Sequence, residues 1–369
     1  MKRPRPAFLL LVLLPIGAGA GAPGSTSLDF LRLPESARLA AMASAGVGFP
    51  DESGSAQLNP AALGLLRSQE ASFAYTRLYE GVGYGVMSYA HPAQKFGNFD
   101  LSLLHLDYGD IAGADASGAK TGNVSASDRQ LRLSWAPQRE TFIPGVSVKA
   151  VQEKLDNATA TAFLADAGVL YRLRRMTFGA SVRNLGTRAK YEGGSGKAPV
   201  VMALGATYRA LADALSLSLD VERASGRPEP LALRTGAEIW LKDAVALRVG
   251  MRTNQDAGPG LSAGAGFKVG AARFDYALSP HGALGLVHHV GLSFKFGQGA
   301  VERYYEQGVH ELRMGNAAEA VILFDKALAV DPKNRRVVEK ALEAAKALEG
   351  FGEPEPAPQA APSRRKGRP

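Results

Sequence analysis

From residue 70 to residue 296 the chain repeats one pattern about fourteen times. Each repeat has roughly ten residues that alternate apolar and polar, followed by a break rich in Gly, Pro or Asp. Leu215, Leu217 and Leu219, for example, alternate with Ser216 and Ser218. Alternation with a period of two predicts strands with one dry face and one wet face. A series of such strands with no helices between them is typical of an antiparallel barrel.

The predicted strands are long, and none of them is continuously apolar. They cover residues 70–79, 82–91, 97–108, 125–136, 145–155, 161–173, 176–185, 199–209, 214–224, 231–242, 245–253, 260–269, 271–279 and 286–296. A soluble β-sandwich also has alternating strands, but its strands usually have only about five or six residues. The pattern therefore favours an all-β transmembrane barrel of about 14 antiparallel strands over a sandwich.

An even number of strands places both ends of a barrel on the same side of the membrane, which is the periplasm for outer-membrane barrels. Short connections at Gly81, at Arg174-Arg175 and at Asp243-Ala244 are interpreted as periplasmic turns. The longer connections 109–124 and 186–198 are interpreted as outer loops. The last strand, 286–296, ends in alternating aromatic residues and resembles the signal that barrel-assembly machinery reads.

The N-terminus has the features of a secretory leader. Lys2, Arg3 and Arg5 precede an apolar run over 7–16, and Ala18-Gly19-Ala20 is a typical cleavage site, which predicts a signal peptide over 1–20. A membrane anchor is the alternative, but the run is shorter than the roughly 20 residues that span a bilayer. The chain has no cysteine, which excludes a lipoprotein, disulfides and thiolate metal sites.

Composition adds two constraints. The net charge of +8 resides partly in the leader and partly in the C-terminal tail, and elsewhere Lys and Arg are scattered singly through strands. This distribution indicates solvated charges in the lumen and at the rim, and it argues against nucleic acid as a partner. No later apolar run is long enough for a spanning helix, so a membrane location requires a barrel.

Residues 21–69 differ from the repeats that follow. An Ala-rich segment over 36–45 predicts a short helix that ends at Gly46, and Asn59 followed by Pro60 predicts the start of a second one. Two helices this short cannot form a domain alone, so we expect them to plug the lumen of the barrel over 70–297. There Asn59 would satisfy backbone groups where a helix meets the wall.

After residue 300 the period becomes helical. Seven residues fall at the spacing of a tetratricopeptide repeat, a helical hairpin of about 34 residues. These predicted packing residues are Tyr304, Gly308, Gly315, Ala320, Phe324, Ala327 and Pro332. A third helix over 336–348 would cover the exposed face and complete a TPR-like unit over 301–349. Because a single repeat is not normally stable alone, we expect this unit to dock on another structure. Residues 350–369, rich in Pro and Ala and basic, predict a disordered tail.

No motif predicts catalysis, and we expect no cofactor and no metal. Gly264-Ala265-Gly266 lies inside a strand pattern, so it does not predict a dinucleotide loop. His288 and His289 would point to opposite faces of one strand and could not bind one metal ion. No Ser lies in a G-x-S-x-G turn. An outer-membrane enzyme is therefore the least favoured hypothesis.

Three N-terminal segments carry a resemblance to a known family. Residues 30–33 (Phe-Leu-Arg-Leu), 37–43 (Ala-Arg-Leu-Ala-Ala-Met-Ala) and 58–63 (Leu-Asn-Pro-Ala-Ala-Leu) resemble the PorV/PorQ family of outer-membrane proteins. That resemblance implies a FadL-like barrel of fourteen strands, plugged by an N-terminal hatch with an Asn-Pro-Ala segment. It also implies Met42, Asn59 and Pro60 as candidate hatch and ligand-gating residues.

Two functions of different class remain open. The resemblance implies an outer-membrane protein that transports hydrophobic small molecules or assists type IX-like protein secretion. The alternative is a non-transporting barrel that anchors a periplasmic docking module. An apolar pocket beside the hatch would favour transport, and a packed lumen would favour docking. The expected partners are outer-membrane lipid, the barrel-assembly machinery and a secretion-system or periplasmic protein bound through the TPR-like unit.

Overall fold

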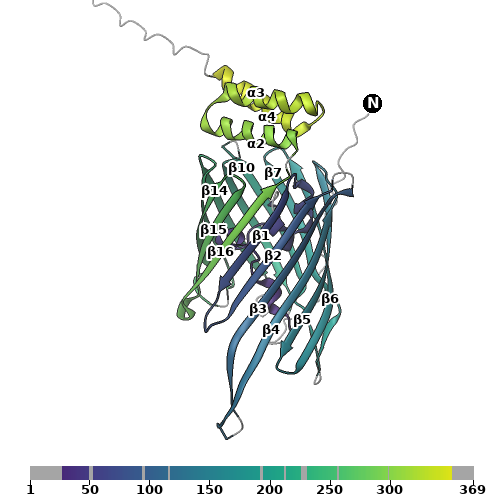
Figure 1. Cartoon of the computed structure of the whole chain (residues 1–369), viewed down its shortest axis with the longest axis vertical. Helices are drawn as coiled ribbons and strands as arrows, with labels where there is room; N and C mark the ends of the chain where they lie inside the picture. The colour runs from purple at the N-terminus through teal and green to yellow at the C-terminus, as the bar shows by residue number, and fades with distance from the viewer. Residues whose placement is uncertain are drawn as a thin grey trace, which may run out of the picture.

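A computed structural model describes residues 27–49, 53–93, 96–114, 117–191, 194–211, 213–225, 231–255, 257–297 and 299–350. The predicted signal peptide and the predicted tail beyond residue 350 lie outside these residues. Fourteen strands form one closed antiparallel barrel, in which β1 pairs with β16 from Gln69↔Phe296 to Arg77↔His288 (Figure 1). The predicted fold class is confirmed, and a two-layer sandwich is excluded because the sheet closes on itself.

The barrel strands agree with the predicted segments to within a few residues except at β3 and β4. They are β1 (Gln69–Arg77), β2 (Gly83–Pro92), β3 (Asn98–Ala114), β4 (Lys120–Ala136), β5 (Phe142–Leu155), β6 (Ala158–Leu173), β7 (Met176–Gly186), β10 (Val201–Ala210), β11 (Leu215–Ala224), β12 (Leu231–Leu241), β13 (Val245–Arg252), β14 (Leu261–Val269), β15 (Ala272–Pro280) and β16 (Leu286–Phe296).

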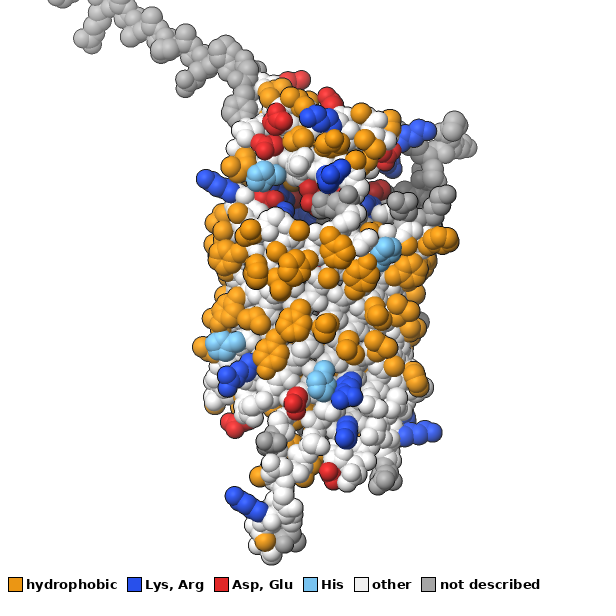
Figure 2. Space-filling view, in the orientation of Figure 1, with side chains coloured by type: hydrophobic (Ala, Val, Ile, Leu, Met, Phe, Trp, Pro, Cys, Tyr) orange, Lys and Arg blue, Asp and Glu red, His pale blue; other side chains and the backbone are white. Residues whose placement is uncertain are grey.

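Side chains alternate between the two faces of the barrel wall. On β11, Leu217 and Leu219 are exposed on the outside, whereas Ser218 and Asp220 are buried inside. The same alternation in the other strands builds an apolar belt around the barrel (Figure 2). Such a belt is the surface that a lipid bilayer requires of a barrel. Among the described helices, none is long and apolar enough to cross a membrane.

The two ends of the barrel differ. The helical end carries the first residue of β1, the last residue of β16 and the helices that follow (Figure 1). The opposite end, here called the loop end, carries the β1–β2 connection. The interpretation of Gly81 as a turn on the same side as Arg174 and Asp243 is therefore wrong. Since β1 starts at the helical end, the β1–β2 connection must lie at the loop end, whatever its length.

Both predicted outer loops are at the loop end, but they contain more structure than expected. Most of 109–124 continues the β3–β4 ladder past a register shift between Asp107 and Asp110. The segment 186–198 holds a separate hairpin of β8 (Arg188–Tyr191) and β9 (Gly194–Lys197). Glycines in these segments suggested loops, yet their backbone still pairs between strands.

The N-terminal residues 27–49 and 53–68, here called the hatch, lie inside the barrel (Figure 1). The hatch contains η1 (Asp29–Arg32), α1 (Ala37–Ala41), η2 (Ser53–Gln57) and η3 (Pro60–Leu65). The first helix ends earlier than predicted because Ala43 and Ser44 adopt left-handed backbone conformations. There the hydroxyl of Ser262 on β14 accepts a hydrogen bond from the Ala43 N–H, so the wall fixes the turn.

Three helices cover the helical end: α2 (Ala300–Met314), α3 (Ala317–Val330) and α4 (Arg335–Gly350) (Figure 1). Together they form the helical unit. Gly315, at φ +87°, ends α2, and the chain reverses into α3. A short loop after α3 leads into the third helix, which was predicted over 336–348.

Candidate functional site

Buried ion pairs fasten the hatch to the barrel wall. Glu238 on β12 is 1% exposed and accepts hydrogen bonds from two guanidinium groups. Its Oε2 lies 2.7 Å from Nε of Arg38 in the hatch and 2.6 Å from Nε of Arg248 on β13. Arg248 also reaches Asp275 on β15 at 2.7 Å. One carboxylate therefore links α1 to the wall, and its second cation continues the network along three strands.

Two further clusters repeat this arrangement. Glu222 on β11 lies 2.6 Å from both Arg183 and Arg234 of the wall and 3.6 Å from Arg32 of the hatch. On the other side of the lumen, Arg132 of β4 pairs with a hatch carboxylate, Glu35, at 2.7 Å. Because ions removed from water are costly unless they are paired, these clusters oppose removal of the hatch.

The lumen charges thus differ from the expectation of solvated side chains: the charged wall residues of these clusters are buried and paired with the hatch or with each other. The sequence held a partial signal, since Asp220, Glu222, Arg234, Glu238 and Arg248 all occupy inward positions of neighbouring strands. Without the fold, nothing connected them to Arg32 or to Arg38.

The side chain of Asn59 forms hydrogen bonds both within the hatch and to the barrel wall. Its Nδ2 donates to the carbonyl oxygens of Val47, at 2.9 Å, and of Val169 on β6, at 3.1 Å. Its Oδ1 accepts from the Ala61 N–H and caps η3, with Pro60 as the first residue of that helix. The expected bonding of Asn59 to backbone groups beside the wall is observed. A gating role for it stays a prediction.

Glycines in the wall allow the hatch backbone to approach closely. A Cβ at Gly179 on β7 would lie 2.1 Å from the Val47 carbonyl oxygen, and one at Gly168 on β6 would lie 2.1 Å from Asn59 Oδ1. Gly250 on β13 would likewise meet Met42, at 2.3 Å. Only a residue without a side chain fits at these positions, so the hatch is packed directly on the strands.

The three predicted hatch residues do not form one site. Met42 is buried against Gly236 and Gly250, on β12 and β13. Asn59 and Pro60 lie against β5 and β6, and three strands of the barrel separate the two places. A gate built from all three residues would therefore have to move as a whole hatch.

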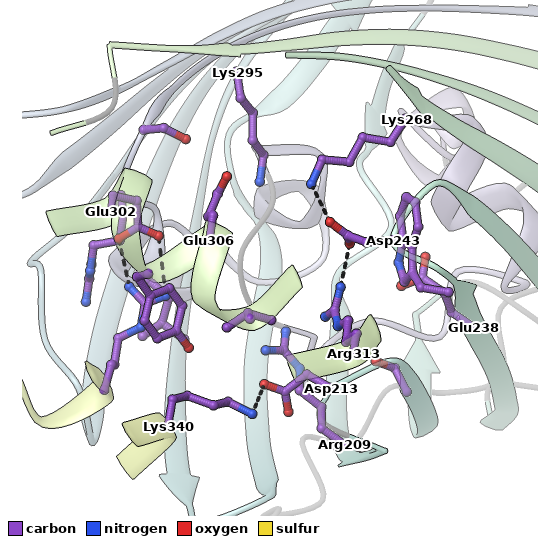
Figure 3. A pocket seen from close by; sticks show the side chains of 18 of the residues that line it. Arg209, Asp213, Glu238, Asp243, Lys268, Lys295, Glu302, Glu306, Arg313 and Lys340 are labelled. Carbon is purple, nitrogen blue, oxygen red and sulfur yellow. Dashed lines mark hydrogen bonds and ion pairs between the residues drawn. The ribbon is translucent and has the colours of Figure 1, made fainter. Parts of the chain in front are cut away.

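Two cavities border the hatch. The smaller, of about 110 Å³, opens near the loop end and is lined by apolar residues such as Leu33 and Leu261 and by polar ones such as Arg252 and His289. The larger, of about 800 Å³, lies between the hatch, the helical end of the barrel and the helical unit (Figure 3). We call it the vestibule. Thirteen Lys or Arg and seven Asp or Glu side chains line it.

Ion pairs hold the helical unit over the vestibule. Asp243, in the β12–β13 turn, lies 2.5 Å from Arg313 of α2 and 3.0 Å from Lys268 of β14 (Figure 3). Asp213, in the β10–β11 turn, lies 3.0 Å from Lys340 of α4. Burial alone would raise the pKa of Asp213, but Lys340 and the nearby Arg209 outweigh it and lower that pKa below its ordinary value. The pairing therefore stabilises the attachment of the helical unit.

Five of the seven predicted packing residues of the helical unit lie where its helices meet, whereas Gly315 and Pro332 lie in the connections between helices. Ala320, Phe324 and Ala327 are buried in one cluster, against which Tyr304 packs. A Cβ at Gly308 would lie 2.6 Å from the Phe324 ring, so α2 and α3 touch there. Pro332 follows the end of α3. This helical hairpin suits a tetratricopeptide repeat, although the assignment to that repeat class stays a prediction.

The histidines and acidic residues in the described part of the chain do not gather into a metal site. No group of three or more His, Cys, Asp or Glu side chains there is placed to hold a metal ion. His289 is buried in the lumen beside Thr76, while His288 is exposed on the outer face beside Tyr276. The two rings point apart, as the strand alternation predicted.

Comparison with known proteins supports the fold. No protein-family model and no curated protein matches the sequence. Among solved structures, the barrel is similar to the Ralstonia pickettii toluene transporter TbuX, at 15% identity and a TM-score of 0.55 over 71% of this chain and 98% of that one. It is also similar to the Pseudomonas putida toluene transporter TodX, at 12% identity and a TM-score of 0.53 over 72% of this chain and 100% of that one.

A Pseudomonas aeruginosa FadL homologue matches at 14% identity and a TM-score of 0.47 over 71% of this chain and 98% of that one. At these identities the likeness is one of fold. The barrel is of the type expected from the resemblance, a FadL-like barrel of fourteen strands. Together with the apolar belt, this fold is consistent with an outer-membrane location.

Proposed function

We propose that this protein is a plugged outer-membrane barrel that holds its helical unit in the periplasm as a docking module for another protein. The observation that supports this most is the lumen: the hatch is fixed by buried ion pairs such as Arg38–Glu238 and packs on wall glycines. A barrel filled in this way is stable, but its lumen is closed to passage. What it presents to its surroundings is the helical unit, fastened to two barrel turns through Asp243 and Asp213.

The helical unit has the surface that a protein partner would need. Ile322 on α3 and Val338 and Leu342 on α4 are exposed apolar side chains, and Val338 and Leu342 lie one turn apart on the same face. In the specific form of this proposal, which rests on the resemblance to PorV/PorQ, the partner belongs to a type IX-like secretion system or is an exported protein delivered to the barrel.

Affinity capture from detergent-solubilised outer membranes tests the docking function. The full chain is compared with Leu342→Glu, which places a charge in the exposed face of α4. The control is Leu284→Glu, another exposed leucine, at the loop end (45% exposed, against 59% for Leu342). We expect a periplasmic or secretion-system protein to co-purify with the wild type and the control and to be lost with Leu342→Glu. Equal recovery with all three chains would reject the helical unit as the docking module.

Transport of a hydrophobic small molecule is the second candidate. It is favoured by the fold shared with two toluene transporters, TbuX and TodX. The small cavity beside Leu33 is the place where such a ligand would enter the hatch region. Uptake of labelled toluene into cells that produce the chain tests the transport function. If uptake is saturable and the Leu342→Glu variant retains it, transport is assigned to the barrel and not to the helical unit.

A further inference from the structure

The vestibule is large enough to hold a ligand. Its volume of about 800 Å³ falls in the range of about 300 to 1,000 Å³ that is typical of ligand pockets. Its floor includes Arg38 and Leu65 of the hatch, its sides are the ends of the strands, and its roof includes Tyr305 and Arg336 of the helical unit. Nine of the thirteen basic side chains are arginines, whose planar guanidinium groups suit phosphate and carboxylate oxygens.

The carboxylates near the vestibule do not balance its cations, because several of them serve two cations each. Asp243 faces both Lys268 and Arg313. Glu140, just outside, lies 2.7 Å from Arg67 and 3.4 Å from Arg172. Over the whole lining, thirteen Lys or Arg side chains face seven Asp or Glu side chains, so the vestibule has an excess of positive charge.

Two observations indicate that a bound anion would stabilise this excess positive charge. Burial and the positive charge of nearby Arg336 lower the pKa of Arg67, despite the pairing of Arg67 with Glu140. The side chain of Lys295 on β16 has no ion pair or hydrogen bond among the described residues, and it points into the vestibule (Figure 3). An unpaired ammonium in a partly enclosed site is stabilised by an anion brought from outside.

The cations of the vestibule lie at the level of the membrane surface. Lys268 is flanked by Phe267 and Val269, and Lys295 is flanked by Phe294 and Phe296. These four apolar side chains are exposed on the outside of the barrel. Because successive residues of a strand point to opposite faces, the inward cations stand at the height of the last lipid-facing residues. Figure 2 shows a recess with charged side chains of both signs directly above the apolar belt.

The barrel rim is low next to these lysines. The β14–β15 turn has only Gly270 and Ala271 between its strands, and both residues line the vestibule. Open space surrounds the position that a Cβ of Gly270 would take. A ligand group can therefore pass from the membrane surface over this turn and reach Lys268 and Lys295.

We propose that the vestibule binds the phosphate-bearing headgroup of an anionic phospholipid, whose acyl chains stay in the bilayer beside β14 and β16. The arginines supply forked donors for phosphate oxygens, and Lys295 and Lys268 supply the first charges that the headgroup meets. Basic sites at the membrane surface attract anionic lipids in this way. This proposal goes beyond the docking function, and it holds whether or not the helical unit binds a protein.

Native mass spectrometry of the full chain in detergent, titrated with phosphatidylglycerol or phosphatidylcholine, tests this assignment. We expect phosphatidylglycerol to bind at least about tenfold more tightly, because both headgroups carry a phosphate but only phosphatidylcholine also carries a cation, which the excess positive charge of the vestibule repels. Lys295→Gln should lower that affinity by roughly tenfold. Lys242→Gln, an exposed lysine at the same end that does not line the vestibule, should leave it unchanged.

Four outcomes would overturn the proposal: equal affinity for the two lipids, equal effects of Lys295→Gln and Lys242→Gln, displacement of the lipid by glycerol 3-phosphate at equal affinity, and stronger displacement by hexaglutamate. The third would assign the site to a soluble phosphate ester, and the fourth to an acidic peptide. If Lys295→Gln fails to fold, Lys346→Gln gives the same test, because Lys346 lines the vestibule from the exposed side of α4.

Discussion

Removal of the Glu238 carboxylate should loosen the hatch far more than the loss of one ordinary contact. Glu238→Ala leaves Arg38 without the partner that lies 2.7 Å from its Nε, and it leaves Arg248 with Asp275 as its remaining acid. Removing one member of a buried ion pair costs about 3 to 5 kcal/mol. Since Arg38 belongs to α1, most of this cost should appear as easier opening of the hatch.

Hydrogen–deuterium exchange of the full chain in detergent measures that opening directly. A cost of about 3 to 5 kcal/mol corresponds to exchange faster by about two to three and a half orders of magnitude, if hatch amides exchange by local opening. We expect this change over residues 36–49 and little change in the barrel strands. Glu80→Ala, which removes an exposed carboxylate from the β1–β2 turn, is the control.

A second variant separates the loss of charge pairing from the loss of packing. Adding Arg38→Met to Glu238→Ala removes the stranded cation as well, and we expect it to restore most of the protection. Exchange that stays within about threefold of the wild type in Glu238→Ala would refute the reasoning, because a hatch held by this network must open more easily without its shared acid.

Three further predictions follow from the contacts of the hatch and the helical unit. Asn59→Ala removes hydrogen bonds to Val47, Val169 and Ala61, and should lower the free energy of unfolding by about 1 to 3 kcal/mol in urea titrations; no change would show that water replaces the amide. Gly308→Val forces a side chain against Phe324 and should reduce the helical circular dichroism signal while the barrel remains folded, at a cost of about 1 to 3 kcal/mol; an unchanged signal would contradict the α2–α3 contact. Because the pKa of Asp213 is lowered in the folded chain, its contribution to attachment is complete above its ordinary value of 3.8 and is lost as the pH falls through the lower folded value. Protease sensitivity of the helical unit should therefore rise on acidification in the wild type, and Asp213→Asn should be sensitive already at neutral pH.

The barrel could be predicted from sequence because its signal is local and repeated. Each strand shows the two-residue period by itself, and segments such as 215–224 and 245–252 need no distant partner to be recognised. The places of the turns were harder. Gly81 was assigned to the wrong end because loop length was used as the criterion, whereas the starting end of β1 determines the side of every connection.

The site could be predicted only in part, because most of its contacts join residues that are far apart in the sequence. Asn59 and Pro60 carry a local capping signal, so their helix start was predicted correctly. The pairing of Arg38 with Glu238 joins residues 200 positions apart, and no periodicity relates them. The vestibule combines the hatch, several turns and two helices, so its residues have no shared pattern along the chain.

Single-channel recording in planar bilayers tests the closed barrel most directly. Fourteen strands enclose a lumen wide enough for water and ions unless it is filled. With the hatch packed on the wall, the wild-type chain should insert without measurable ion conductance, and deletion of residues 27–66 should produce stable conducting steps. Steady conductance from the wild-type chain would contradict the plugged barrel and, with it, the assignment of function to the helical end.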